Sequence, residues 1–291
     1  MHFLAAVSEA LSMVRSVMLR RNSHPMKINY RETAQDLQTR IDIHQKYGGR
    51  DIDTWMLDLL TPKEGWRILD VGCGAGKQCE AFHRRLEGRG VIVGADISTE
   101  LLAQAKQLGA ELGNGFHLLE SDFNRDMALV GEHFDLVTCC FAIYYAADAS
   151  MTIDEMHRVL KPGGTLFTTG PMPENKRLFY DVIKEATNQP IPSMPGSSRY
   201  GSEILQVLQN TFSDVQVHIF ENPLTFVEAE PFLAYVRASL SEDRRLWSEF
   251  FRSEGDFDRI LDRIAVASER RLAQDGELVM TKVVGGFIAR R

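Results

Sequence analysis

Three glycines within five residues, directly after a short apolar segment, constrain this chain more than any other feature. Residues 66–71 predict a buried strand and residues 77–86 predict a helix, with the run Gly72-Cys73-Gly74-Ala75-Gly76 between them. Glycine has no Cβ, so such a turn reaches backbone conformations closed to other residues and can approach a ligand closely. In doubly wound α/β sheets, ligands bind at this end of the strands. We therefore expect a parallel sheet with a ligand site at the glycine run.

The alternation of strands and helices continues beyond this turn. Further strands are expected at residues 91–96, 116–120, 134–139 and 165–169, with helices at 99–108 and 151–160 between them. Strands that alternate with helices form a mostly parallel sheet covered on both faces. After residue 170, prolines mark a loop-rich excursion around a helix at 176–187, followed by a helix at 202–210 and a strand at 215–220. The stretch 228–275 reads as a helical insertion or lid before a closing strand at 283–289.

The two ends of this pattern suggest a division of the chain into residues 1–60, an N-terminal helical segment or lid, and residues 61–291, the main domain. The first 25 residues carry three arginines against one acid, with apolar residues at helical spacing. They are interpreted as an amphipathic targeting or membrane-surface helix, a packing helix, or an upstream extension.

Composition excludes several classes of function. The formal charge of −7 argues against a broad nucleic-acid surface, so no DNA partner is expected. The four cysteines form no CxxC pair and no zinc pattern, which predicts reduced thiols, no bound metal and a cytoplasmic protein. No apolar stretch is long enough to predict a membrane span. The sequence makes no prediction about oligomeric state.

Acidic residues follow the expected strands at positions that suit an adenosine. Lys77 stands where the dinucleotide-binding fingerprint needs its third glycine, and Asp70 before the run disfavours a pyrophosphate, so an NAD-dependent oxidoreductase is disfavoured. Asp96 ends the second strand, where a carboxylate accepts hydrogen bonds from ribose hydroxyls. Asp122 can accept the adenine amino group, and Phe123 can pack on the ring.

Together these motifs resemble the class I S-adenosylmethionine-dependent methyltransferases. The resemblance covers about residues 60–170, and it rests on the segments Ile68–Gly76, Gly94–Ser98, Ser121–Phe123, Phe134–Val137 and Arg158–Gly164. It implies a seven-stranded Rossmann-like sheet with the strand order 3-2-1-4-5-7-6 and an antiparallel last strand.

The resemblance also implies S-adenosyl-L-methionine as the cofactor. Gly72, Cys73, Gly74 and Gly76 would then hold its methionine part, with Asp70 supporting the loop. Asp96 would bind the ribose, Ile97 would pack on the adenine, and Asp122 with Phe123 would hold the adenine edge. The backbone of Cys140 would line the cofactor.

The implied reaction is an in-line transfer of the methyl group to a small-molecule acceptor. Tyr144, Tyr145 and Tyr200 are the expected acceptor-binding residues, and no catalytic base is assigned. Residues 140–145 and 168–171 also resemble the RNA cap guanine-N7 methyltransferases, an alternative that the acidic charge disfavours. A protein of the same fold that binds the cofactor without catalysis is the other alternative.

Overall fold

The computed structural model describes residues 33–112, 115–125, 127–192, 194–240, 243–251 and 255–291; the first 25 residues, for which alternatives were weighed above, lie outside these ranges. Within the described residues, strands form one seven-stranded sheet in the order β3-β2-β1-β4-β5-β7-β6. β7 runs antiparallel to both of its neighbours, and the other pairings are parallel. The predicted strand order and the antiparallel last strand are confirmed. The strands are β1 (Arg67–Val71), β2 (Val91–Asp96), β3 (Phe116–Glu120), β4 (Phe134–Cys140), β5 (Leu160–Pro171), β6 (Asp214–Phe226) and β7 (Leu278–Arg290).

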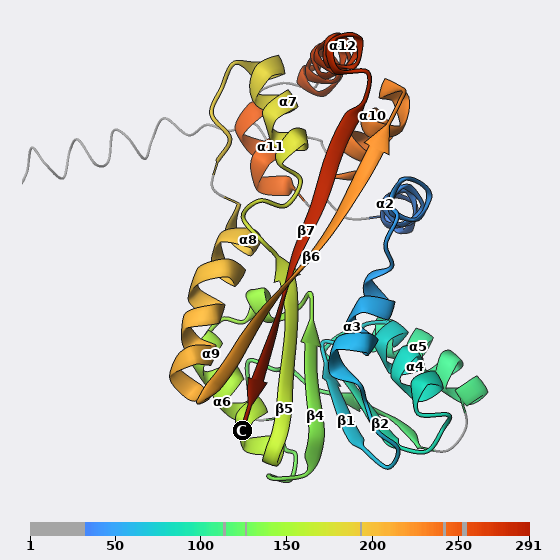
Figure 1. The fold of residues 1–291 in the computed structure, drawn as a ribbon, viewed down its shortest axis with the longest axis vertical. Helices are drawn as coiled ribbons and strands as arrows, with labels where there is room; N and C mark the ends of the chain where they lie inside the picture. Colours follow the sequence, from blue (N-terminus) through green and yellow to red (C-terminus); the bar gives the residue numbers. More distant parts are fainter. Residues whose placement is uncertain (1–32, 113–114, 126, 193, 241–242, 252–254) are drawn as a thin grey trace, which may run out of the picture.

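Helices cover both faces of this sheet, because successive residues of each buried strand point to opposite sides. In β1, Ile68 packs toward α3 (Ile52–Leu60), α4 (Lys77–Arg85) and α5 (Thr99–Leu112), whereas Leu69 packs toward the other face. That second face is covered by α6 (Ala149–Val159), the short helix η1 (Ile143–Tyr145), the π-helical turn η2 (Tyr200–Ile204) and α9 (Leu205–Thr211), with α8 (Pro195–Arg199) beside them (Figure 1). The doubly wound α/β class is therefore confirmed.

β6 and β7 continue well beyond the other strands and carry a cap. The sequence predicted strands that end at residue 220 and begin at residue 283, but the two pair from Asp214 opposite Arg290 to Phe226 opposite Leu278. Pro223 disfavours a strand in a sequence-based reading; on an edge strand its missing N–H costs no ladder hydrogen bond. The cap helices surround the far end of this antiparallel strand pair (Figure 1) and are α2 (Ala34–Tyr47), α7 (Arg177–Thr187), α10 (Ala229–Ala238), α11 (Arg244–Phe250) and α12 (Asp256–Asp275).

The cap has its own hydrophobic core. Phe220, Leu224 and Phe226 alternate with exposed residues along β6, and the last two pack against aromatic and aliphatic side chains of the helices. The stretch expected to be a helical insertion contains α10, α11 and α12 among its described residues. None of the described helices combines the length and apolar character needed to cross a bilayer.

A buried ion pair ties the end of β5 to the cap. Lys176 is 4% exposed and Asp243 is 2% exposed, and the Lys176 Nζ lies 2.9 Å from the Asp243 Oδ2. The Tyr180 hydroxyl donates to the other carboxylate oxygen of Asp243 at 3.3 Å. Removal of one charge would break this ion pair in a buried position, which costs far more than loss of an exposed ion pair.

We therefore expect Asp243→Ala to lower the free energy of unfolding by about 3–5 kcal/mol. The matched control is Asp181→Ala, which breaks the exposed ion pair with Arg177 and should cost less than about 1 kcal/mol. Urea denaturation followed by circular dichroism measures both. Equal losses in the two variants would show that the buried pair contributes no more than a surface pair.

Candidate functional site

The glycine run turns sharply at the carboxyl end of β1. The N–H groups of Gly72 and Cys73 both donate to the Ala95 carbonyl, at 2.8 and 3.0 Å. Gly72 has φ +72° and Gly74 has φ +54°, in the left-handed region. A Cβ at Gly72 would lie 2.6 Å from the Cβ of Ala142, so a side chain there would collide with the segment after β4. The loop thus depends on glycine, as the sequence predicted.

Asp96, at the end of β2, fixes this loop from the side. Its Oδ2 accepts the Gly74 N–H at 2.8 Å, and its Oδ1 accepts the Ser98 N–H at 2.8 Å. A carboxylate oxygen has two lone pairs, so each can accept a further hydrogen bond from a ligand. Ile97 follows directly and is 63% exposed, an apolar side chain at the rim of the loop.

The segment after β3 lies on the same edge of the sheet. Asp122 is half-buried, and its Oδ1 accepts the Asn124 N–H at 2.9 Å. Phe123 is half-buried against the core, and its ring would lie 3.9 Å from a Cβ at Gly72. The structure therefore brings the glycine loop, Asp96, Ile97, Asp122 and Phe123 together at the carboxyl ends of β1, β2 and β3.

Asp70 lies beneath the loop. It is 2% exposed, and its Oδ1 accepts the hydroxyl hydrogen of Thr138 at 2.7 Å. The Cys79 thiol lies 3.6 Å from its other oxygen. Burial raises the pKa of Asp70 from 3.8 to about 6, although the hydrogen bond from Thr138 opposes this shift. These contacts join Asp70 to β4 and α4, and the role in supporting the loop that the resemblance implied stays a prediction.

The cysteines near the loop are structural. Cys73 and Cys79 are buried, and Cys140 is half-buried with its Sγ 3.9 Å from the Met56 Sδ. Burial raises the pKa of the Cys139 and Cys140 thiols, and the hydrogen bond with Cys73, followed by burial, raises the pKa of the Cys79 thiol. Because the thiolate is the reactive form of cysteine, these side chains are poor nucleophiles.

The tyrosines expected at the acceptor side differ in their exposure to solvent. Tyr145 is 72% exposed, and its ring lies 4.6 Å from the half-buried ring of Tyr144. Arg199 fixes this turn by donating to the carbonyl oxygens of Tyr144 and Ala146. Both tyrosines lie just beyond the carboxyl end of β4, where the sequence placed them.

Tyr200 does not line an acceptor surface, contrary to the sequence-based expectation. It is fully buried, its ring stacks on Phe287 at 4.5 Å, and its hydroxyl donates to the Thr168 carbonyl at 2.8 Å. Gly170 and Gly285 make room for this ring, because a Cβ at Gly170 would approach it to 2.5 Å. The pattern of an isolated tyrosine in a proline-rich excursion did not distinguish a core ring from a surface ring.

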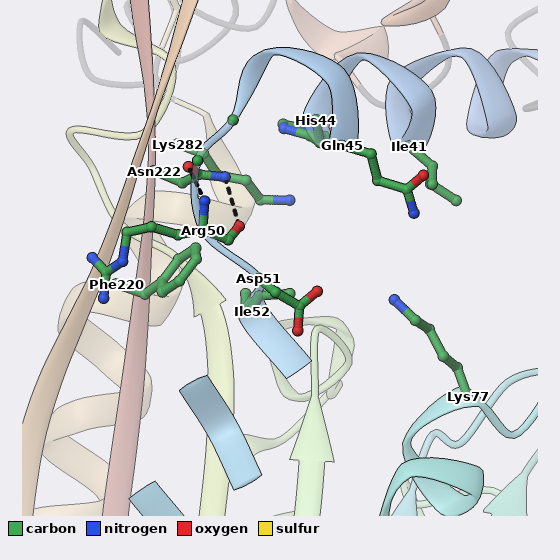
Figure 2. A pocket seen from close by; sticks show the side chains of 12 residues that line it. Ile41, His44, Gln45, Arg50, Asp51, Ile52, Lys77, Phe220, Asn222 and Lys282 are labelled. Atoms are coloured by element: carbon green, nitrogen blue, oxygen red, sulfur yellow. Dashed lines mark hydrogen bonds between the residues drawn. The ribbon is translucent and has the colours of Figure 1, made fainter. Parts of the chain in front are cut away.

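A cavity of about 370 Å³ opens beside the glycine loop (Figure 2). It lies between the end of α2, the linker to α3, the start of α4, and the antiparallel strands β6 and β7. The sequence analysis did not identify this site, because its walls come from distant parts of the chain and from strand segments it read as loop. The lining residues are Ile41, His44, Gln45, Gly48, Gly49, Arg50, Asp51, Ile52, Lys77, Phe220, Asn222 and Lys282.

Asp53 is a further acid at this edge that the sequence analysis did not single out. Its Oδ2 lies 2.7 Å from the Lys77 Nζ, and its Oδ1 is buried without a hydrogen-bond partner among the described residues. Asp53 also contributes to the raised pKa of Cys140, after burial and the charge of Asp70.

Comparison with known proteins places this geometry in a family. The family described as "Methyltransferase domain" matches residues 68–164, which include β1 to β4 and the start of β5. The nocamycin O-methyltransferase of Saccharothrix syringae is 31% identical over 124 residues, 43% of this chain and 44% of that protein. The ubiquinone biosynthesis O-methyltransferase of Mesorhizobium japonicum is 35% identical over 106 residues, 36% of this chain and 41% of that protein. The chain thus spans less than half the length of each of these relatives.

Residues 68–164 of this chain thus match a methyltransferase domain. Among solved structures, the YcgJ protein of Bacillus subtilis has the same fold, with a TM-score of 0.54 and 15% identity over 82% of this chain and 97% of that one. The methyltransferase match ends at residue 164, so β6, β7 and the cap helices α10 to α12 lie outside it.

The loop of this methyltransferase domain fits a cationic adenosyl ligand. A Cβ at Gly74 would meet only Leu101, at 4.0 Å, so the loop leaves space beside Gly74, and Asp96 offers lone pairs on both carboxylate oxygens. The exposed Ile97 offers an apolar surface for a base. The carboxylates of Asp96 and Asp122 add negative charge, which favours a positively charged ligand over a pyrophosphate.

The raised pKa of Asp70 makes a testable prediction. The folded domain binds a proton at this carboxyl more tightly than the unfolded chain, whose ordinary value is 3.8. The ionised carboxylate therefore lowers stability above about pH 6, and this penalty disappears as the pH falls below about 4. Asp70→Asn keeps the acceptor for Thr138 and removes the charge. The free energy of unfolding of this variant, relative to wild type, should therefore rise as the pH increases from about 4 to about 6.

The expected rise in the free energy of unfolding is at most about 3 kcal/mol, the equivalent of about two pKa units. Urea denaturation at a series of pH values measures the difference between variant and wild type. A difference that is constant from about pH 4 to about pH 7 would show that Asp70 has the same pKa folded and unfolded.

Proposed function

We propose that this protein transfers the methyl group of S-adenosylmethionine to a small-molecule acceptor by in-line displacement. The observation that carries this proposal is the glycine loop held open by Asp96, with Ile97, Asp122 and Phe123 on the same edge. The family match over residues 68–164 supports it, and the relatives named above are O-methyltransferases.

In this proposal, residues at the ends of β1, β2 and β3 bind the donor. Asp96 accepts hydrogen bonds from the ribose, Ile97 and Phe123 pack on the adenine, and Asp122 accepts from its amino group. The backbone of Gly72, Cys73, Gly74, Gly76 and Cys140 surrounds the methionine part. When bound, the donor supplies a methyl group that its sulfonium already makes electrophilic, so the protein mainly contributes alignment and a dry site.

The acceptor side lies beyond the ends of β4 and β5. Tyr144 and Tyr145 offer aromatic surfaces there, and Arg199 keeps their turn in place. We propose that α2, described from residue 34, and the helical stretch of about residues 228–275 act as a lid that limits the access of water. Exclusion of water strengthens the electrostatic contacts that align donor and acceptor.

Loss of the Asp96 carboxylate should weaken donor binding. We expect Asp96→Ala to raise the Kd for S-adenosylhomocysteine by about 10- to 100-fold, because hydrogen bonds to a charged group are lost. Asp96→Asn keeps one acceptor oxygen and should fall between this variant and wild type. Asp135→Asn is the control, since Asp135 lies at the opposite edge of the sheet, where it accepts the Arg67 N–H.

Isothermal titration calorimetry measures these affinities, and circular dichroism confirms that each variant is folded. Failure of the wild type to bind S-adenosylhomocysteine would overturn the proposed function. Unchanged affinity in folded Asp96→Ala would remove Asp96 from the donor site.

Tyr145 should affect turnover and leave donor affinity unchanged. Once a screen with radiolabelled methyl donor has found an acceptor, we expect Tyr145→Ala to lower kcat/KM by about tenfold or more, because misplacement of the acceptor slows an in-line reaction. Tyr145→Phe retains the ring and should keep most of the activity. If Tyr145→Ala transfers methyl groups at the wild-type rate, the acceptor binds elsewhere.

A further inference from the structure

The cavity beside the glycine loop lies between the start of α4 and the strands β6 and β7. One wall is Lys77, the residue directly after the loop, and the opposite wall includes Lys282 of β7. The Lys282 Nζ lies 5.7 Å from the ring centre of Phe141, which follows β4. Asp96 and Asp122 lie on the other side of the loop, at the ends of β2 and β3. A donor held at Asp96 and Asp122 would therefore extend across the loop toward this cavity.

Basic side chains enter this cavity from separate elements, although the whole chain carries a formal charge of −7. Lys77 comes from α4, Lys282 from β7, and His44 from α2. Figure 2 shows Lys77 and Lys282 reaching toward the space from opposite sides. Asp51 is the acidic side chain among the described residues that line it, and its Oδ1 already accepts the Thr54 N–H at 2.7 Å.

Lys282 is the cation best placed to act on a ligand. The Lys77 side chain is 69% exposed and lies 2.7 Å from Asp53, so solvent and that carboxylate screen its charge. The Arg50 guanidinium lies over the Phe220 ring at 4.7 Å and donates to the Glu221 carbonyl (Figure 2). Lys282 is half-buried, and a charge in a less hydrated position acts more strongly on its surroundings.

The remaining walls are apolar and held in a fixed arrangement. Ile41, Ile52 and Phe220 contribute apolar surface. The buried Asn222 side chain accepts the Arg50 N–H at 3.2 Å and donates to the Arg50 carbonyl at 3.1 Å, which fastens the linker between α2 and α3 to β6. Apolar walls with a few polar groups are typical of sites for small organic molecules.

We propose that the methyl acceptor extends from Tyr144 and Tyr145 past Phe141 into this cavity, and that it is an organic acid whose carboxylate contacts Lys282. This assignment rests on the proposed function, because it takes the donor to lie across the glycine loop. An ammonium group binds a carboxylate through charge-assisted hydrogen bonds, whereas a neutral acceptor would gain nothing from it. The apolar walls hold the body of the acid next to the reactive end of the donor.

The experiment uses benzoate as the carboxylate probe and benzamide as its neutral counterpart. Each is titrated into the full-length protein saturated with S-adenosylhomocysteine, and ligand-observed NMR measures the affinity. We expect wild type to bind benzoate about tenfold more tightly than benzamide, and Lys282→Gln to remove this preference. Lys282→Arg keeps the charge and should keep much of the preference. Lys63→Gln is the control, because it removes an equal charge between α3 and β1, at the opposite edge of the sheet.

The outcomes separate this proposal from the proposed function. Wild type that binds S-adenosylhomocysteine but shows no preference for benzoate would overturn the acidic acceptor and leave methyl transfer intact. A preference that survives in Lys282→Gln would also overturn it. Affinities for S-adenosylhomocysteine and for 5′-methylthioadenosine, which lacks the amino-acid end, complete the test. If Lys282→Gln weakens the binding of S-adenosylhomocysteine by about tenfold and leaves the binding of 5′-methylthioadenosine unchanged, Lys282 binds the carboxylate of the donor and the proposal is wrong.

Discussion

The backbone ladder between β6 and β7 runs unbroken from Asp214 opposite Arg290 to Phe226 opposite Leu278. β5 pairs with β7 only as far as Pro171 opposite Val284, so beyond that point the two strands have each other as partners. A two-stranded ribbon is at best marginally stable in water unless something packs on it. The helices of the cap provide that packing, and the cap in turn brings α2 and the linker after it to the mouth of the sheet. Without this ladder the cavity would lose two of its walls.

The carboxyl edge of the sheet is divided between two kinds of chemistry. At the ends of β1 to β3, backbone amides and carboxylates surround a glycine turn, and the hydrogen bonds from Gly74 and Ser98 hold Asp96 at its centre. On the side of β6 and β7, cationic and apolar side chains line a cavity whose wall Asn222 holds in place. Negative charge on one side suits a sulfonium donor, and positive charge on the other suits an acid. The glycine turn lies between them because it follows β1, which lies between β2 and the strands β4 to β6 in the sheet.

The sequence predicted that the residues of the first half lie together, and it did not predict the second half. The glycine run, Asp96 and Asp122 lie at strand ends within short repeating units, so local pattern places them relative to one another. The cavity brings Lys282, Asn222 and Phe220 near α2 because strands that are far apart in the chain pair with each other. No local sequence pattern predicts this proximity. Pro223 made the full length of β6 hard to predict from the sequence. The cost of a proline in a strand depends on whether the strand lies at the edge of the sheet, which the sequence does not show. Tyr200 was misplaced since the space for its ring comes from Gly170 and Gly285, which only the folded sheet brings together.

The position of β7 has a consequence for how the protein is made. This strand is synthesised after every other strand of the described sheet, yet it lies between β5 and β6. While the chain is still growing, β5 presents an open edge of backbone groups, and β6 has no strand to pair with. Open edges of this kind recruit other chains, which makes incomplete translation products prone to aggregate. Residues 278–290 therefore act as a late closing segment, whose arrival completes the sheet and allows the cap to assemble.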